Sequence, residues 1–121
     1  MATITYTVTV ASGTNQYGTG NKFYINGEVS PVLYLQEGNT YIFDQSNSSN
    51  AVGGIHILAF STNANNSPTA SYTTGVTTTG TPGNAGANTT IVVAPVRTTG
   101  APLLFYYCTV HAGMGLSLIH I

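Results

Sequence analysis

Hydrophobic and polar residues alternate along residues 3–10 of the chain. Ile4, Tyr6, Val8 and Val10 occupy one set of alternate positions, and threonines occupy the other set. Successive side chains of a strand point to opposite faces, so this pattern predicts a half-buried β-strand. No stretch repeats apolar residues at the 3.6-residue spacing of an amphipathic helix, and we therefore expect little or no helix.

Short apolar or β-branched runs follow this first strand, and turn-forming residues separate them. Asn26-Gly27 lies between two such runs and predicts a tight hairpin, because both central positions of a type I′ turn need a positive φ. The expected hairpin strands are 22–25 and 28–29, and further strands are expected at 32–35, 40–44, 55–60, near 74–78, 89–94 and 103–107. The remaining segments 11–21, 45–54 and 61–88 are polar or glycine-rich and are expected to be mainly loops.

About seven short strands joined by turns indicate an all-β protein, a Greek-key β-sandwich. The chain has 121 residues, which is enough for one domain with one hydrophobic core. No internal repeat is visible, and we expect a single domain over residues 1–115.

Residues 116–121, Leu-Ser-Leu-Ile-His-Ile, are interpreted separately. They match one reading frame of a transposase adapter that is common in sequencing libraries. We therefore interpret them as translated adapter, with the domain truncated at its C-terminus. The alternative is a genuine last strand, since Leu116, Leu118 and Ile119 are apolar. Under the first interpretation His120 is not a ligand.

The chain carries very few charges: two basic residues, three acidic residues and a net charge of −1. Without a basic patch to neutralise phosphates, we expect no nucleic-acid binding. The absence of charge also disfavours a freely diffusing redox shuttle steered by charged patches. A surface rich in Ser, Thr and Asn is more typical of a virion or extracellular module. No stretch is long and apolar enough to predict a membrane span, and no secretory signal is visible.

The segment Cys108-Thr-Val-His111-Ala-Gly-Met114 carries the most specific chemistry of the chain. A thiolate, an imidazole and a thioether on one glycine-containing loop favour copper, and blue-copper sites combine two His, one Cys and a weak axial Met. His56 is available as the second histidine. Each residue alone has a plainer interpretation, since a lone Cys is usually a small buried hydrophobe and a Met fills core gaps. The single cysteine excludes an internal disulfide and a copper site bridged by two thiolates.

Residues 106–115, Tyr-Tyr-Cys-Thr-Val-His-Ala-Gly-Met-Gly, resemble the ligand loop of the cupredoxins, the plastocyanin-like single-domain copper proteins. Over residues 3–115 the chain resembles a narrower group, the cupredoxin-like domains found in predicted proteins of marine phages and their metagenomic relatives. The stretches that carry this second resemblance are 6–10, 20–27, 40–50, 56–62 and 72–83.

The resemblance implies a mononuclear type 1 site that holds one Cu(I)/Cu(II) ion. Its implied ligands are His56, Cys108, His111 and Met114. The chain also departs from the family pattern around the first histidine. Ile57 follows His56 where the family tends to have Pro, Ile55 precedes it where an Asn is common, and the segment 51–55 looks longer than usual.

The expected function is one-electron transfer rather than catalysis. A site whose ligands all come from the protein has no open position for a substrate, whereas catalytic metals keep one free. The alternative is a structural or adhesive module of a phage virion or cell surface, in which copper is incidental. A zinc or copper-storage site is a third interpretation, but zinc rarely takes a thioether ligand. The partner, a redox protein or virion proteins, is left unidentified.

Two further expectations concern single residues. Strand alternation predicts that one of Tyr106 and Tyr107 packs inward and the other outward, with packing favoured over a redox role. Asp44, which ends an apolar strand, is expected to cap the loop 45–50 by accepting hydrogen bonds from backbone N–H groups rather than to take part in chemistry.

Overall fold

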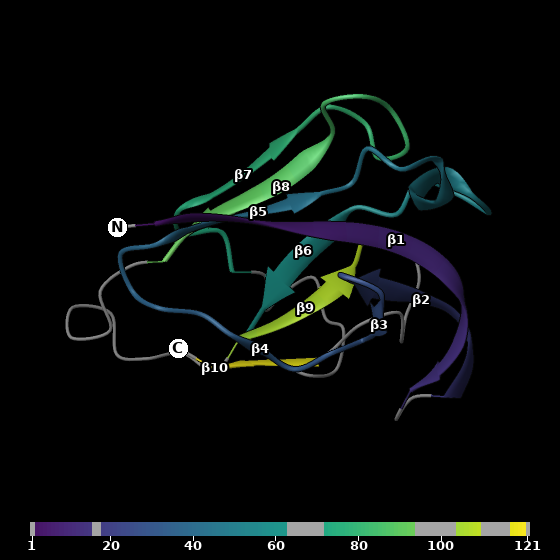
Figure 1. Ribbon diagram of the computed structural model, residues 1–121, viewed down its shortest axis with the longest axis horizontal. Helices are drawn as coiled ribbons and strands as arrows, with labels where there is room; N and C mark the ends of the chain where they lie inside the picture. Colours follow the sequence, from purple (N-terminus) through teal and green to yellow (C-terminus); the bar gives the residue numbers. More distant parts are fainter. Residues whose placement is uncertain (1, 16–17, 63–71, 94–103, 110–116, 121) are drawn as a thin grey trace.

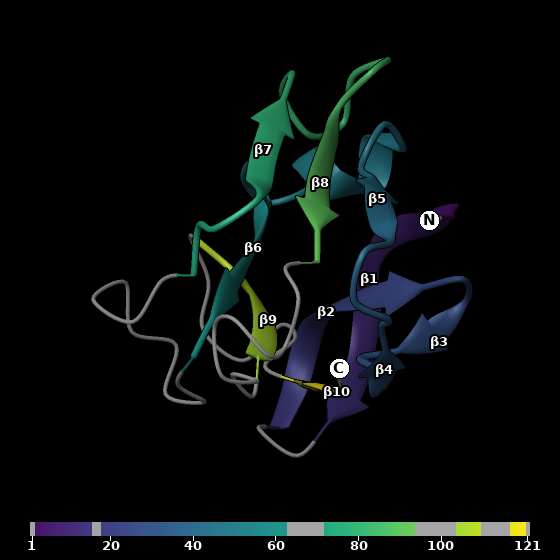
Figure 2. The same ribbon diagram turned by 90° about the vertical axis from the view of Figure 1, so that its left-hand side faces the viewer.

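The computed structural model describes residues 2–15, 18–62, 72–93, 104–109 and 117–120. Ten strands and one 3₁₀ turn lie in these residues, and the strands form two facing layers (Figures 1 and 2). The elements are β1 (Thr3–Asn15), β2 (Gly18–Ile25), β3 (Glu28–Val29), β4 (Leu33–Tyr34), β5 (Thr40–Asp44), η1 (Ser48–Ala51), β6 (Leu58–Ser61), β7 (Val76–Thr79), β8 (Asn88–Val92), β9 (Leu104–Cys108) and β10 (Ser117–His120).

The strand order confirms the expected all-β sandwich. One sheet has six strands in the order β3-β2-β1-β5-β8-β7, and the other has four in the order β4-β10-β9-β6. The chain passes from one sheet to the other between β3 and β4 and returns at β5, as crossing Greek-key connections require. Most pairs are antiparallel, but β1 pairs with β5 and β10 pairs with β4 in parallel.

The expected hairpin forms between β2 and β3. Ile25 pairs with Glu28 across the turn. The two turn residues, Asn26 and Gly27, have φ values of 51° and 86°. A pair of positive φ angles is the signature of the type I′ turn, whose twist matches that of the two strands. The Asn26 side chain adds a long-range link, because its Oδ1 accepts a hydrogen bond from Thr7 N–H at 2.9 Å.

The core lies between the two sheets and is mainly apolar. Val8 and Val10 are buried in β1, while Ile4 and Tyr6 are partly buried and pack against the core, as the alternation predicts. Aromatic rings fill the centre, with the ring centroids of Phe43 and Phe60 5.5 Å apart in an edge-on arrangement. The side chains that join the two sheets come from both, and include Phe23, Ile25, Phe43, Leu58, Phe60, Ile91, Leu104 and Tyr106.

Several strand boundaries differ from the sequence-based expectation, and β2, for example, begins at Gly18 rather than at residue 22. The first strand continues to Asn15, although residues 11–21 were expected to form a loop. The reason is a change of partner, since residues 3–7 pair with β5 and residues 8–15 pair with β2. The strand expected at residues 55–60 begins only at Leu58, so His56 precedes it on irregular backbone.

The prediction for the two adjacent tyrosines was right for Tyr106 and wrong for Tyr107. Tyr106 is 0% exposed and belongs to the core, whereas Tyr107 is 5% exposed although one of the two was expected to face solvent. Alternation places neighbouring side chains on opposite faces, but the outer one is exposed only when the outer face of the sheet is open to water. Burial of both rings means that both faces of β9 are covered at this point. Tyr106 also donates a hydrogen bond from its hydroxyl to the Pro31 carbonyl at 2.6 Å.

The C-terminal segment forms strand β10. Ile119 pairs with Leu33 of β4 on one side and with Leu104 of β9 on the other. This is the strand that the alternative interpretation of residues 116–121 described. The adapter origin of the segment stays a prediction, because a segment with alternating apolar residues can pair whatever its source.

Candidate metal centre

Two of the four predicted ligands, His56 and Cys108, lie side by side in the core. Cys108 ends β9, and it pairs with Leu58, the first residue of β6. His56 lies two residues before Leu58, and its Nδ1 atom is 3.6 Å from Cys108 Sγ. The side chains are 0% and 1% exposed. The pairing of β6 with β9 thus brings together two residues that are 52 positions apart in the chain.

The hydrogen bond that His56 makes with the Val52 carbonyl indicates which of its ring nitrogens carries the proton. Its Nε2 atom is 2.7 Å from the Val52 carbonyl oxygen. A carbonyl can only accept, so Nε2 carries the proton of the neutral imidazole. Nδ1 is then the unprotonated ring nitrogen, and it is the one that contacts Cys108 Sγ. This is the tautomer in which His56 can bind a metal through Nδ1.

The separation of these two atoms fits a shared metal ion. Metal–sulfur and metal–nitrogen bonds of about 2.3 and 2.0–2.1 Å, at angles from tetrahedral to trigonal, place the two ligand atoms about 3.5–3.8 Å apart. The observed distance of 3.6 Å lies in this range. The same distance allows a thiol S–H to donate to Nδ1, which describes the pair when no metal is bound.

His111 and Met114, the other two predicted ligands, lie outside the described residues, as does the loop that joins them. Within the part of the chain that is described, no three side chains among His, Cys, Asp and Glu gather at one point. The described geometry therefore concerns only His56 and Cys108, the two predicted ligands that the pairing of β6 with β9 brings together.

Two buried amide side chains next to His56 were missed by the sequence analysis. Gln45 is 1% exposed and Asn50 is 0% exposed. The Gln45 Nε2 group donates to the His56 carbonyl at 2.6 Å and to Asn50 Oδ1 at 3.1 Å. Both residues lie in a segment of Ser, Asn and Gln that looks like an ordinary polar loop. No signal in a single sequence separates the two buried amides from their exposed neighbours.

The expectation that Asp44 caps the following loop is confirmed for one backbone N–H group. The Asp44 Oδ1 atom accepts a hydrogen bond from Ser46 N–H at 2.9 Å. A second cap follows within the same loop, because Asn47 Oδ1 accepts from Ser49 N–H and begins the turn η1. These contacts shape the loop between β5 and the His56 segment.

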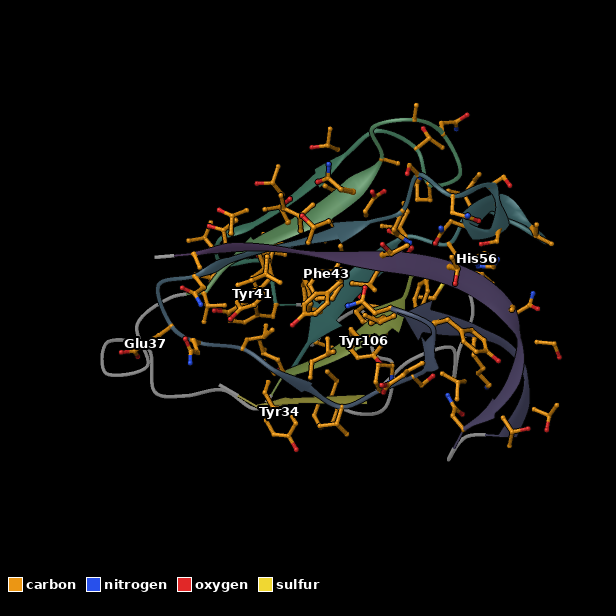
Figure 3. All side chains as sticks on the ribbon, in the orientation of Figure 1. Tyr34, Glu37, Tyr41, Phe43, His56 and Tyr106 are labelled. Atoms are coloured by element: carbon orange, nitrogen blue, oxygen red, sulfur yellow. The ribbon has the colours of Figure 1, made fainter. Side chains whose placement is uncertain are left out.

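The ligand pair lies at one end of the sandwich. Figure 3 shows His56 beside the bend of β1, while Tyr41 and Glu37 lie at the opposite end and Phe43 and Tyr106 lie between them. Two apolar side chains close to His56 in the chain, Val52 and Ile55, are 60% and 39% exposed. Val52 and Ile55 thus present exposed apolar side chains in the segment that leads to the buried imidazole.

Comparison of the chain with protein-family models, with curated proteins and with solved structures finds no match. Among the described residues, no helix is long and apolar enough to cross a membrane.

Proposed function

We propose that this domain binds one copper ion through His56, Cys108, His111 and Met114 and transfers one electron. The observation that supports the proposal most is the buried pair of His56 Nδ1 and Cys108 Sγ, 3.6 Å apart. Its supporting detail is the Val52 carbonyl, which holds the proton of His56 on the other nitrogen. His56 and Cys108 belong to segments that are far apart in the chain, so neither local sequence dictates their contact in the core. The contact therefore supports the ligand set independently of the cysteine motif.

The donor set suits copper for chemical reasons. Thiolate and thioether ligands favour Cu(I), imidazole binds both oxidation states, and a bound copper ion would supply reversible one-electron chemistry. Cys108 and His56 would contribute a thiolate and a neutral imidazole, and both residues are buried. With every ligand supplied by the protein, no position is left for a substrate, which favours electron transfer over catalysis.

A second candidate, a structural or adhesive module of a virion or cell surface, is supported by the surface. Thr77, Thr78 and Thr79 are all exposed on the edge strand β7. Uncharged hydroxyl-bearing strands of this kind offer hydrogen bonds to a partner but no electrostatic steering. Recovery of the complete gene among genes unrelated to virion assembly would count against this candidate.

The copper proposal is tested by an absorption titration of the full 121-residue chain with Cu(II). We expect an intense blue thiolate-to-copper band that saturates at one equivalent, because a Cys thiolate bound to Cu(II) gives this transition. Cys108→Ser is expected to abolish the band, and His56→Ala and His111→Ala to abolish it or shift it strongly. His120→Ala is the matched control, since His120 is not among the proposed ligands.

Three results would contradict the proposal. One is a folded protein that takes up no copper. A second is a copper spectrum that Cys108→Ser leaves unchanged. A third is a preference for Zn(II) that excludes copper under competition, which would turn attention to a structural zinc site.

A further inference from the structure

The backbone that carries His56 is buried but does not belong to the β ladder. Residues 55–57 have no strand assignment, although Leu58 directly after them begins β6. Buried backbone N–H and C=O groups need partners, and here the ladder does not supply them. The His56 N–H donates to the Asn50 carbonyl at 2.9 Å, and the Ile57 carbonyl accepts from Thr109 N–H at 3.1 Å.

Gln45 satisfies the backbone on both sides of this irregular segment. Its Nε2 group donates to the His56 carbonyl at 2.6 Å, and its Oε1 atom accepts from Leu58 N–H at 3.0 Å. The backbone of Gln45 is itself held, because its N–H donates to Ala87 and its carbonyl accepts from Gly83. One side chain therefore ties the His56 peptide to the start of the strand that pairs with Cys108.

Asn50 connects this arrangement to the opposite sheet. Its Nδ2 group donates to the Val8 carbonyl of β1 at 2.9 Å, and its Oδ1 atom accepts from Gln45. Its backbone carbonyl accepts from His56 N–H. Displacement of the His56 backbone thus requires breaking hydrogen bonds in a network that reaches across the sandwich.

Burial of two primary amides is costly unless their hydrogen bonds are made. A regular strand through residue 56 would satisfy its own backbone through the ladder and would need no amide side chain. The chain instead leaves the ladder at His56 and uses Gln45 and Asn50 to satisfy the backbone there. In this arrangement His56 Nδ1 lies against Cys108 Sγ.

We propose that Gln45 and Asn50 are positioning residues that hold His56 with Nδ1 toward Cys108, and that they set the copper affinity and the copper spectrum of the centre. The copper part of this inference rests on the proposed function, whereas the orientation of His56 does not. Residues that orient a metal ligand through hydrogen bonds commonly change metal affinity by about 10–100-fold when they are replaced.

The first test uses the wild-type chain without metal. We expect ¹⁵N NMR of His56 to show a single neutral tautomer with the proton on Nε2, as its bond to Val52 requires. A wild-type His56 protonated on Nδ1 would overturn the inference, whether or not any variant folds.

The second test compares Gln45→Met with Tyr41→Phe. Gln45→Met keeps a side chain of similar length but removes its bonds to His56 and Leu58. We expect mixed His56 tautomers without metal, a shifted blue band, and a Cu(II) affinity reduced by about 10–100-fold. Tyr41→Phe removes a comparable hydrogen bond, from Gln36 N–H at 2.7 Å, at the other end of the sandwich (Figure 3). It should lower the Tm without changing the tautomer, the band or the affinity.

Asn50→Ala provides a second variant if Gln45→Met does not fold. It retains the backbone carbonyl that binds His56 N–H and removes the side chain that holds Gln45, so we expect smaller changes in the same direction. A single tautomer and wild-type affinity in folded Gln45 and Asn50 variants would overturn the inference. A wild-type protein with the expected tautomer but no copper band would instead overturn the proposed function and leave the positioning of His56 supported.

Discussion

At the scale of single residues, the chemistry of this protein depends on what surrounds each side chain. A lone cysteine is usually an inert buried group. Cys108 differs because the base nitrogen of His56 lies 3.6 Å from its sulfur. His56 in turn presents that nitrogen because the Val52 carbonyl binds the other one. The surroundings of Cys108 therefore depend on His56 and Val52 and not on the cysteine motif alone.

Tyr6 gives a residue-scale prediction for pH. Its ring stacks on Tyr41 with centroids 6.0 Å apart and tilts over Phe43 at 5.1 Å. Burial, and secondarily the charge of an ionised Tyr41, raise the pKa of Tyr6 above its ordinary value of 10.0. The folded protein therefore keeps the Tyr6 proton at pH values where the unfolded chain has released it. This contribution to stability is present below pH 10 and is lost as the pH rises through the folded pKa.

The measurement is urea unfolding of the wild type and of Tyr6→Phe at several pH values from 8 to above 10. We expect the free energy of unfolding of the wild type to fall more steeply with pH than that of Tyr6→Phe, because Phe has no proton to release. Parallel pH curves for the two proteins would show that Tyr6 does not titrate differently in the folded state.

At the scale of elements, turns with positive φ determine which strands can pair. The Asn26-Gly27 turn closes the β2–β3 hairpin, and Gly75 closes the turn before β7. Gly75 has a φ of 70°, and its carbonyl accepts a hydrogen bond from Val92 N–H at 2.9 Å. A side chain at Gly75 would collide with the Val92 carbonyl oxygen. This glycine is required by both its conformation and the close approach of β8.

We predict that Gly75→Ala destabilises the protein far more than Gly86→Ala. Gly86 has a similar φ of 83° but has open space where a Cβ would lie. Both substitutions carry the left-handed backbone cost of about 1 kcal/mol. Gly75→Ala adds a backbone clash, for a total of about 2–4 kcal/mol. Thermal or urea unfolding measures the difference, and equal losses would contradict the close approach of Gly75 to Val92.

At the scale of the whole molecule, the smaller sheet depends on the end of the chain. In its order β4-β10-β9-β6, strand β10 is the neighbour that joins β4 to β9. Cys108 lies on β9, so the pairing of β10 supports the strand that carries the candidate ligand. The sheet order thus links the C-terminal segment to the candidate metal centre, although the two are not adjacent along β9.

A chain ending at residue 116 tests this dependence. We expect it to lose on the order of 2 kcal/mol of stability, since several backbone hydrogen bonds of about 0.5–1.5 kcal/mol each disappear with β10. A chain ending at residue 120, which keeps the whole of β10, is the control. Equal unfolding free energies for the two chains would show that β10 adds nothing to stability.

Local patterns in the sequence were sufficient for much of the fold. The alternation of residues 3–10, the Asn26-Gly27 turn and the strand at residues 40–44 were all predicted and are present. Each of these depends on neighbours in the chain, through side-chain alternation or backbone φ preference. The apolar strand before Cys108 was predicted for the same reason, although Cys108, expected on the loop after it, is its last residue.

Other features follow only from contacts between distant segments. The continuation of β1 to Asn15 depends on its exchange of partners, and the burial of Tyr107 depends on what covers the second face of β9. Both features depend on contacts between segments that are far apart in the chain, and the local periodicity of the sequence carries no information about such contacts.

The sequence by itself determined the all-β class and the main turns, and it named the residues that we propose as copper ligands. Only the tertiary structure decided that His56 meets Cys108 and that the His56 backbone is hydrogen-bonded to Gln45 and Asn50. The physical reason is that ligand type is a property of one side chain, whereas ligand geometry depends on strand register and buried hydrogen bonds between segments far apart in the chain.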